Sequence, residues 1–147
     1  MLRSTRGERT KTASRSCHLL AFSVGGRQLA VKTDEVAGIS GWKGSISVPS
    51  RTPFVSAVVR QDAVVLPVFN LAGLLRVAVQ GDELLCLTAK HRDGLMAICI
   101  DAEMPVLHTL DVTAIKAYRG NEFKAVGTFT NGFDEIPIIS LAQLGSA

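Results

Sequence analysis

The chain has 147 residues, of which 47% are hydrophobic and 20% charged, a composition typical of one globular domain or two very small ones. No apolar run approaches the roughly 18 residues that a membrane-spanning helix requires, so no direct membrane insertion is expected. The net charge of +3 is uneven, because residues 1–17 carry +4 and residues 18–147 carry −1. A body with that balance has no positive field to hold a polyanion, so the folded part is not expected to bind nucleic acid.

Residues 1–17 are rich in arginine, serine and threonine and contain few apolar side chains. They lack the apolar core of a secretory signal. We expect a disordered basic tail, because such a segment has almost nothing to bury. An organelle transit peptide shares this composition, but the absence of an apolar face favours the unfolded tail.

Short apolar runs broken by turn residues begin at His18. The first run ends at the pair Gly25-Gly26 and a second follows directly, which predicts a β-hairpin because glycine accepts the positive φ of a tight turn. Further strands are predicted over residues 46–48, 54–59 and 64–69. Asn70 is then placed to cap a helical turn that extends to residue 75.

The second half of the chain repeats this order. Runs over residues 84–89 and 95–100 predict a second hairpin with a longer loop. Later strands are expected over 125–130 and 136–139, joined by a turn that contains Asn131-Gly132. Residues 141–144 predict a last helical turn.

These similarities indicate an internal repeat. Residues 65–74 match residues 135–144 at an offset of 70, with Pro67 and Pro137 in equivalent positions. Three matches upstream have offsets of 68, 67 and 65: Ser56–Val58 with Lys124–Val126, Leu29–Val31 with Met96–Ile98, and Leu19–Leu20 with Leu84–Leu85. A duplicated unit that gained residues in its loops explains the drift. Since proline cannot donate to a ladder, both prolines are expected at a strand edge or bulge.

The predicted fold class is therefore mainly β, with two SH3-like five-stranded β-barrel subdomains and short helical turns. We expect subdomain one over about residues 18–80 and subdomain two over about 81–147.

No arrangement of residues predicts catalysis. The three histidines, at positions 18, 91 and 108, are scattered, and neither they nor the cysteines have metal-ligand spacing. Cys86 and Cys99 lie in apolar runs, where a free cysteine behaves as a small buried hydrophobe, and reduced thiols indicate the cytoplasm. We expect no enzyme activity, no metal and no cofactor.

Several segments carry a resemblance to a known family. They are residues 18–32, 34–39, 48–59, 64–71, 125–128 and 136–141, with sequences such as Val64-Val65-Leu66-Pro67-Val68-Phe69-Asn70-Leu71. Together they resemble the CheW-like domain over nearly all of residues 18–147. The fold of that family, a pair of five-stranded β-barrels, agrees with the repeat.

The resemblance implies a non-catalytic adaptor of bacterial chemosensory arrays. Such proteins bridge the cytoplasmic tips of methyl-accepting receptors to the regulatory domain of a CheA-type histidine kinase. The family places receptor and kinase contacts around the turn before the strand at residues 64–69. The residues expected at the partner surface are Val36, Ile39, Ala57, Arg60, Asp62, Ala63 and Val64.

This chain departs from the family at that turn. The family commonly reads Asn-x-Arg-Gly, whereas this chain has Arg60-Gln61-Asp62-Ala63, and an acid frequent in the family is replaced by Gly38. One interpretation is a coupling protein adapted to different receptors or a different kinase, as in a gliding or pilus-type system, since a reversed charge changes partner choice. Drift in a divergent copy is the other. A different class of function also stays open, in which the basic tail binds nucleic acid or an anionic membrane.

Overall fold

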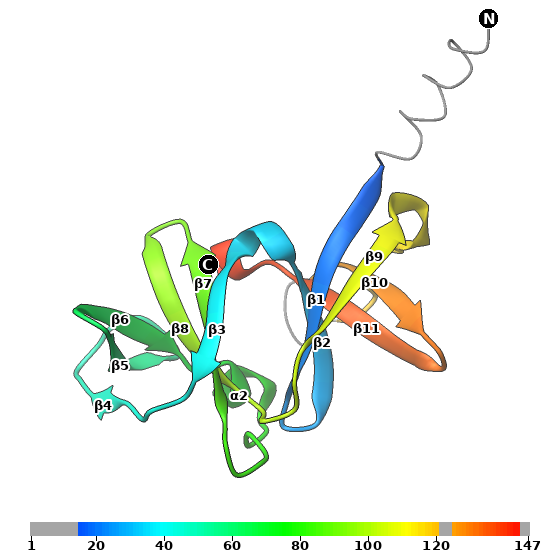
Figure 1. Ribbon diagram of the computed structural model, residues 1–147. Coiled ribbons are helices and arrows are strands. Elements are labelled where there is room, and N and C mark those ends of the chain that lie inside the picture. Colours follow the sequence, from blue (N-terminus) through cyan, green and yellow to red (C-terminus); the bar gives the residue numbers. More distant parts are fainter. Residues whose placement is uncertain (1–14, 121–124, 145–147) are drawn as a thin grey trace, which may run out of the picture.

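The computed structural model describes residues 15–120 and 125–144, which form two curled β-sheets side by side (Figure 1). The strands are β1 (Ser16–Val24), β2 (Arg27–Lys32), β3 (Val36–Gly41), β4 (Ile46–Ser47), β5 (Val55–Gln61), β6 (Val64–Phe69), β7 (Leu85–His91), β8 (Gly94–Ile100), β9 (Val106–Asp111), β10 (Ala125–Asn131) and β11 (Asp134–Ile139). The helical segments are α2 (Leu71–Leu75) and the 3₁₀ turns η1 (Thr33–Glu35), η2 (Val112–Ala114) and η3 (Leu141–Gln143). The predicted fold class is confirmed.

The two sheets, here called barrel A and barrel B, do not follow the two halves of the sequence. Barrel A has five strands in the order β10-β11-β2-β1-β9, and barrel B has six in the order β3-β7-β8-β6-β5-β4. The boundary expected near residue 80 lies between α2 and β7, inside barrel B, so it does not separate the sheets. Barrel B is one continuous stretch, whereas barrel A joins the N-terminal hairpin to the last three strands.

The internal repeat explains this division. Ala30 of β2 pairs in parallel with Ile138 of β11, and Ala97 of β8 pairs in parallel with Val68 of β6. The hairpin of each sequence repeat therefore completes the barrel formed by the other repeat. Both hairpins pair with their barrels in the same way. Their sequences alone therefore cannot indicate which of the two barrels each hairpin joins.

The registers correct two of the alignments made from the sequence. In the first hairpin Leu20 pairs with Val31, and in the second hairpin Leu87 pairs with Ile98. Each residue of the second pair lies 67 residues after its counterpart in the first pair. The match of Leu19–Leu20 with Leu84–Leu85, at an offset of 65, is therefore wrong. Strands β5–β6 and β10–β11 correspond at an offset of 70, each with a register shift near its start, so the match at 68 is also wrong. Both hairpins close with two-residue turns, so the second loop is shorter than expected.

Both prolines were expected at a strand edge or a bulge. They do not lie at a sheet edge, because β6 and β11 each have a neighbour on both sides, but a register shift of the antiparallel partner begins one residue after each of them. The parallel neighbour is registered one residue after each proline, at Val68 and Ile138. Neither proline is itself registered with its parallel neighbour. The absence of a proline N–H therefore removes no registered pair from the parallel ladder.

The first strand begins inside the segment that was expected to be a disordered basic tail. Residues 1–14 lie outside the described residues. Ser16 pairs with Asp111 and Cys17 pairs with Leu110, so the sheet begins before the boundary expected at residue 17.

Buried apolar side chains form three clusters, and β1 contributes to two of them. Leu19 faces the interior of barrel A, whereas Leu20, Phe22 and Val24 face barrel B, because alternate residues of a strand point to opposite sides. The cluster between the barrels is the largest and also contains Leu29, Val31, Phe69, Leu71, Leu75, Leu87, Ala89, Met96, Ile98, Ile100, Ile139 and Leu141. The two barrels therefore share most of their core and pack as one body.

Asp101 joins three segments at one end of this shared core. Its buried carboxylate accepts hydrogen bonds from the backbone N–H groups of Gly25 at 2.8 Å, Gly26 at 2.9 Å and Gln80 at 2.8 Å. The first two belong to the turn of barrel A and the third to the connection between α2 and β7. A side chain at Gly25 would overlap Val77, and its φ is +62°, so glycine is required there.

Two further contacts hold the C-terminal segment against barrel B. Glu35 accepts hydrogen bonds from the N–H of Leu141 at 2.6 Å and the hydroxyl of Ser140 at 3.3 Å. The Nε2 atom of His91 lies 2.7 Å from the carbonyl oxygen of Leu144. Both side chains therefore connect segments far apart in the sequence.

Candidate partner-binding site

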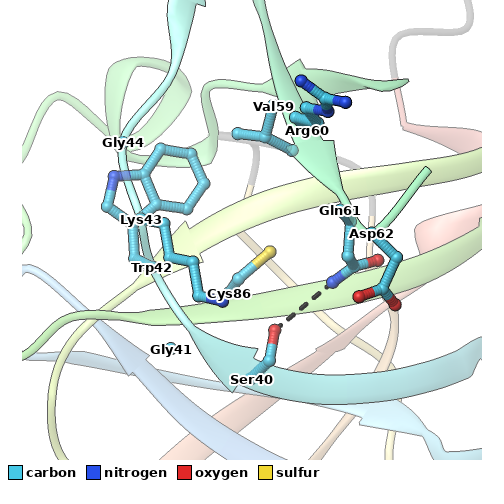
Figure 2. Close-up of a pocket in the computed structure, with 10 residues that line it drawn as sticks. All are labelled: Ser40, Gly41, Trp42, Lys43, Gly44, Val59, Arg60, Gln61, Asp62 and Cys86. Carbon is cyan, nitrogen blue, oxygen red and sulfur yellow. Dashed lines mark hydrogen bonds between the residues drawn. The ribbon is translucent and has the colours of Figure 1, made fainter. Parts of the chain in front are cut away.

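A cup opens at the end of barrel B, between the last residues of β3 and those of β5 (Figure 2). Its volume is about 210 Å³, below the range of about 300–1,000 Å³ typical of small-molecule sites, so it suits a single protruding side chain. The cup is lined by Ser40, Gly41, Trp42, Lys43, Gly44, Val59, Arg60, Gln61, Asp62 and Cys86.

The floor of the cup is apolar and consists of Trp42, Val59 and Cys86. The backbone N–H of Trp42 donates to the carbonyl oxygen of Leu84 at 2.9 Å, which ties the segment after β3 to the start of β7. Burial raises the pKa of the Cys86 thiol, and hydrogen bonds with its neighbours oppose that shift only in part. The thiol is therefore uncharged at neutral pH, and the floor carries no ionised group.

The rim of the cup is polar. The side-chain amide of Gln61 donates to the hydroxyl oxygens of Ser40 at 3.3 Å and Thr88 at 3.4 Å, so it holds the ends of β3 and β5 together (Figure 2). Lys43, Arg60 and Asp62 are exposed around the opening. An apolar centre inside a charged rim is the usual arrangement of a protein–protein contact.

Asp62 has a φ of +55°, in the left-handed region that asparagine and aspartate tolerate better than most residues. Gly132, at the equivalent turn of barrel A, has a φ of +67°. An aspartate at position 62 therefore suits the backbone conformation of this turn.

The seven predicted site residues fall into two groups. Arg60 and Asp62 line the cup, Ala63 is exposed on the same turn, and Val64 is exposed at the start of β6. Ile39 is 38% exposed, but it lies on the face of β3 opposite to Ser40 and the cup.

The two remaining predicted residues are not free surface. Val36 is partly buried against the core between the barrels. Ala57 is partly buried against the interior of barrel B. Val36 and Ala57 therefore contribute mainly to packing, whereas the other five predicted residues are exposed or line the cup.

Sequence reasoning missed the floor of the cup. Trp42 lies in the segment Gly41-Trp42-Lys43-Gly44, where a lone tryptophan between glycines was a usable signal. Val59 and Cys86 gave none, because they resemble ordinary core residues of strands.

The family model of the CheW-like domain matches residues 18–144, so the chain belongs to the CheW-like domain family. This family assignment supports a role as a chemotaxis scaffold or adaptor.

Among solved structures, the chain is similar to the scaffolding protein TtCheW from Thermoanaerobacter tengcongensis. The identity is 14%, the TM-score is 0.75, and the match covers 87% of this chain and 86% of the other. At that identity the likeness concerns the fold. No curated protein matches the sequence.

Within residues 15–120 and 125–144, no helix is long and apolar enough to cross a membrane. The same residues contain no group of three or more histidine, cysteine or acidic side chains placed to hold a metal ion.

Proposed function

We propose that this chain is a non-catalytic cytoplasmic adaptor that couples chemoreceptors to a CheA-type histidine kinase. The observation that carries the proposal is the cup with its apolar floor and charged rim, on an exposed turn of a CheW-like domain. The regulatory domain of the kinase docks on this turn, and a receptor tip docks on the other face of β3. The altered charges at the turn suit a kinase or receptor different from those of the common family pattern, as in a gliding or pilus-type system.

Exposed apolar side chains around the turn support the kinase contact. Val64 is 53% exposed and Val65 61%, and Ile46 on the neighbouring edge strand β4 is 68% exposed. Neighbouring exposed apolar side chains with polar surroundings are typical of docking surfaces. Arg60 and Asp62 then contribute selectivity, because charges at a rim act mainly on partner choice and association rate.

Apolar side chains away from the turn support the receptor contact. Ile39 projects from β3 on the side of the core shared by the barrels, and Val36 packs against that core. On barrel A, Val106 is 55% exposed and Leu107 70% exposed on the edge strand β9. Two separate surfaces are what an adaptor requires if it is to hold both partners at once.

The positions of the best-buried acids support the absence of catalysis. Asp101 and Glu35 each accept backbone hydrogen bonds that join distant segments. Their lone pairs are thus used in structure, and neither lines the cup.

Calorimetry with a cognate kinase regulatory domain and a receptor cytoplasmic tip tests this proposal. Arg60→Glu should weaken kinase binding by about tenfold, since reversing a contact charge costs roughly 1–3 kcal/mol, and should leave receptor binding unchanged. Ile39→Ser should show the converse. Arg92→Glu, on the exposed turn between β7 and β8, is the matched control and should change neither. If Arg60→Glu binds the kinase domain as well as the unaltered chain, the turn is not the kinase site.

Substitutions at Asp62 separate charge from backbone strain. Asp62→Asn removes the charge and keeps a residue that tolerates a positive φ, whereas Asp62→Arg restores the family charge and adds strain. If both variants lose binding to the cognate kinase, and only Asp62→Arg changes the unfolding midpoint relative to the unaltered chain, a charge contact at Asp62 is supported. Unchanged binding in both would remove Asp62 from the site.

A further inference from the structure

We propose that Cys86 and Cys99 form a reversible redox site, which closes to an intrachain disulfide when the chain meets a hydroperoxide and so alters the floor of the cup. This site goes beyond the adaptor role. An effect of its closure on kinase binding would rest on the proposed function, so the test uses only the purified chain.

The two cysteines stand directly opposite each other on neighbouring strands. Cys86 of β7 is registered with Cys99 of β8, so both side chains lie on the same face of the sheet. The next registered pair, Leu87 with Ile98, is buried in the core between the barrels. The cysteines therefore project to the other face, where Cys86 packs inside barrel B. Both thiols are free.

The hydrogen bonds between β3 and β7 show which type of cross-strand pair the cysteines form. The N–H of Trp42 donates to the carbonyl oxygen of Leu84 at 2.9 Å, so the backbone groups of Leu84 point towards the β3 side. The backbone groups of Cys86 point the same way, because every second residue of an antiparallel strand turns its N–H and C=O to the same side. They therefore point away from β8, and Cys86 with Cys99 is a non-hydrogen-bonded pair.

This type of pair has a spacing that a disulfide can bridge. The Cα atoms of non-hydrogen-bonded pairs lie about 4.5 Å apart. Disulfides span Cα separations of about 4.4–6.8 Å, so rotation of the two side chains can join the sulfurs without movement of the strands. The pair lies at the short end of that range, where the bond is strained and easily reduced. The geometry therefore favours a reversible link over a permanent structural one.

A small oxidant can reach the pair. Cys86 lines the cup, whose volume of about 210 Å³ admits a hydroperoxide, and its sulfur points into the cup (Figure 2). Cys99 is partly exposed. Burial raises the pKa of both thiols, to about 11 for Cys99, so neither is a reactive thiolate at neutral pH. The reactivity of this site therefore depends on the two sulfurs being held together rather than on one activated cysteine.

The reaction balances with the hydroperoxide as the two-electron oxidant. One sulfur loses its proton and attacks an oxygen of the hydroperoxide, the O–O bond breaks, and a sulfenic acid forms as an alcohol or water leaves. The second sulfur then attacks the sulfenic sulfur, the S–S bond forms, and hydroxide leaves with the second thiol proton as water. Each thiol gives up one hydrogen, and the peroxide bond is reduced. Two small thiols reverse the closure by exchange and become a disulfide themselves.

Closure acts on the cup because Cys86 belongs to the network behind its rim. The Cys86 thiol hydrogen-bonds with the side chains of Ser40 and Thr88, whose hydroxyl oxygens also accept from the side-chain amide of Gln61. A bond to β8 draws the sulfur away from Ser40 on β3. Trp42, the one tryptophan of the chain, packs against the same cluster as Cys86, so its fluorescence should change on oxidation.

The test treats the folded chain with hydrogen peroxide and maps the products by mass spectrometry. Cys86 and Cys99 should be recovered as one linked peptide, and dithiothreitol should return both thiols together with the original Trp42 fluorescence. Cys17→Ala is the matched control. It removes a thiol that is registered with Leu110 rather than with a second cysteine, so it should close in the same way.

Two variants test the intermediate. In Cys86→Ala and in Cys99→Ala the remaining sulfur has no partner. Dimedone labelling of the sulfenic acid should therefore rise by about tenfold or more in at least one of them, because in the unaltered chain the opposite thiol captures it first. Alanine suits both positions, since a buried free cysteine packs as a small hydrophobe.

Several outcomes would each overturn the proposal. They are two free thiols after oxidation of the folded chain, a link that forms only in urea, a link between two chains, closure that leaves Trp42 fluorescence unchanged, and labelling that rises in neither variant. Peptide mapping uses the unaltered chain, so the proposal can be refuted even if neither variant folds.

Discussion

Removal of the Asp101 carboxylate should destabilise the chain more than any surface change, because this group joins the turn of barrel A to barrel B. Asp101→Ala deletes the acceptor of three backbone N–H groups at 2.8–2.9 Å. A hydrogen bond to a charged group contributes about 1.5–3 kcal/mol, and the bonds are only partly buried, so water replaces some of the lost energy. We expect a loss of about 3–5 kcal/mol in the free energy of unfolding, a large fraction of the 5–15 kcal/mol typical of domains.

Asp101→Asn gives a graded comparison. One amide oxygen can still accept from Gly25 and Gln80, but the amide nitrogen then faces the N–H of Gly26 and leaves it without an acceptor. The expected loss is about 1–3 kcal/mol.

Urea unfolding followed by Trp42 fluorescence and by circular dichroism measures both losses. Asp82→Asn, an exposed acid in the connection between α2 and β7, is the control and should stay within about 0.5 kcal/mol of the unaltered chain. If Asp101→Ala is no less stable than this control, the three bonds do not hold the barrels together.

Three further predictions concern other regions. Burial, with smaller contributions from Cys86 and Asp101, raises the pKa of Cys99 from its ordinary 9.0 to about 11, so the unfolded chain ionises first. The free energy of unfolding should therefore fall between about pH 9 and pH 11 and fall less in Cys99→Ala, and identical pH profiles would contradict this. Glu35→Gln should speed hydrogen exchange of the Leu141 amide, because a charged acceptor at 2.6 Å becomes a neutral one, and unchanged exchange would show that the bond adds no protection. Deleting residues 1–14 should shift the unfolding midpoint by no more than a few degrees. A salt titration of both forms against DNA and anionic vesicles tests the alternative function, which tail-dependent binding at physiological salt would support.

Local sequence determined many of the elements, because each depends on neighbouring residues, but it did not predict β3 or β9. The Gly25-Gly26 pair predicted the first turn, and both residues have positive φ. The helical turn after Asn70 is confirmed, since the Asn70 side chain accepts a hydrogen bond from the N–H of Gly73 at 2.9 Å. The repeat and the membership in the CheW-like family were likewise visible in the order of short motifs.

The candidate site was predictable only in part. Arg60 and Asp62 belong to one continuous turn, so a motif could locate them. The floor of the cup is assembled from β5, β7 and the segment after β3, and Val59 on this floor corresponds to the larger Phe129 of barrel A. That comparison needs the three-dimensional correspondence of Val59 and Phe129, because the upstream alignment made from sequence was displaced by two residues.

The sequence by itself determined that this chain is a duplicated, mainly β, CheW-like domain with a basic N-terminal segment. Only the tertiary structure decided that each hairpin completes the barrel of the other repeat, and that Asp101 holds the two barrels together. The physical reason is that strand patterning specifies which face of a hairpin is buried but not which of two similar edges it joins. That choice depends on contacts between residues far apart in the chain, such as Ala30 with Ile138 and Gly25 with Asp101.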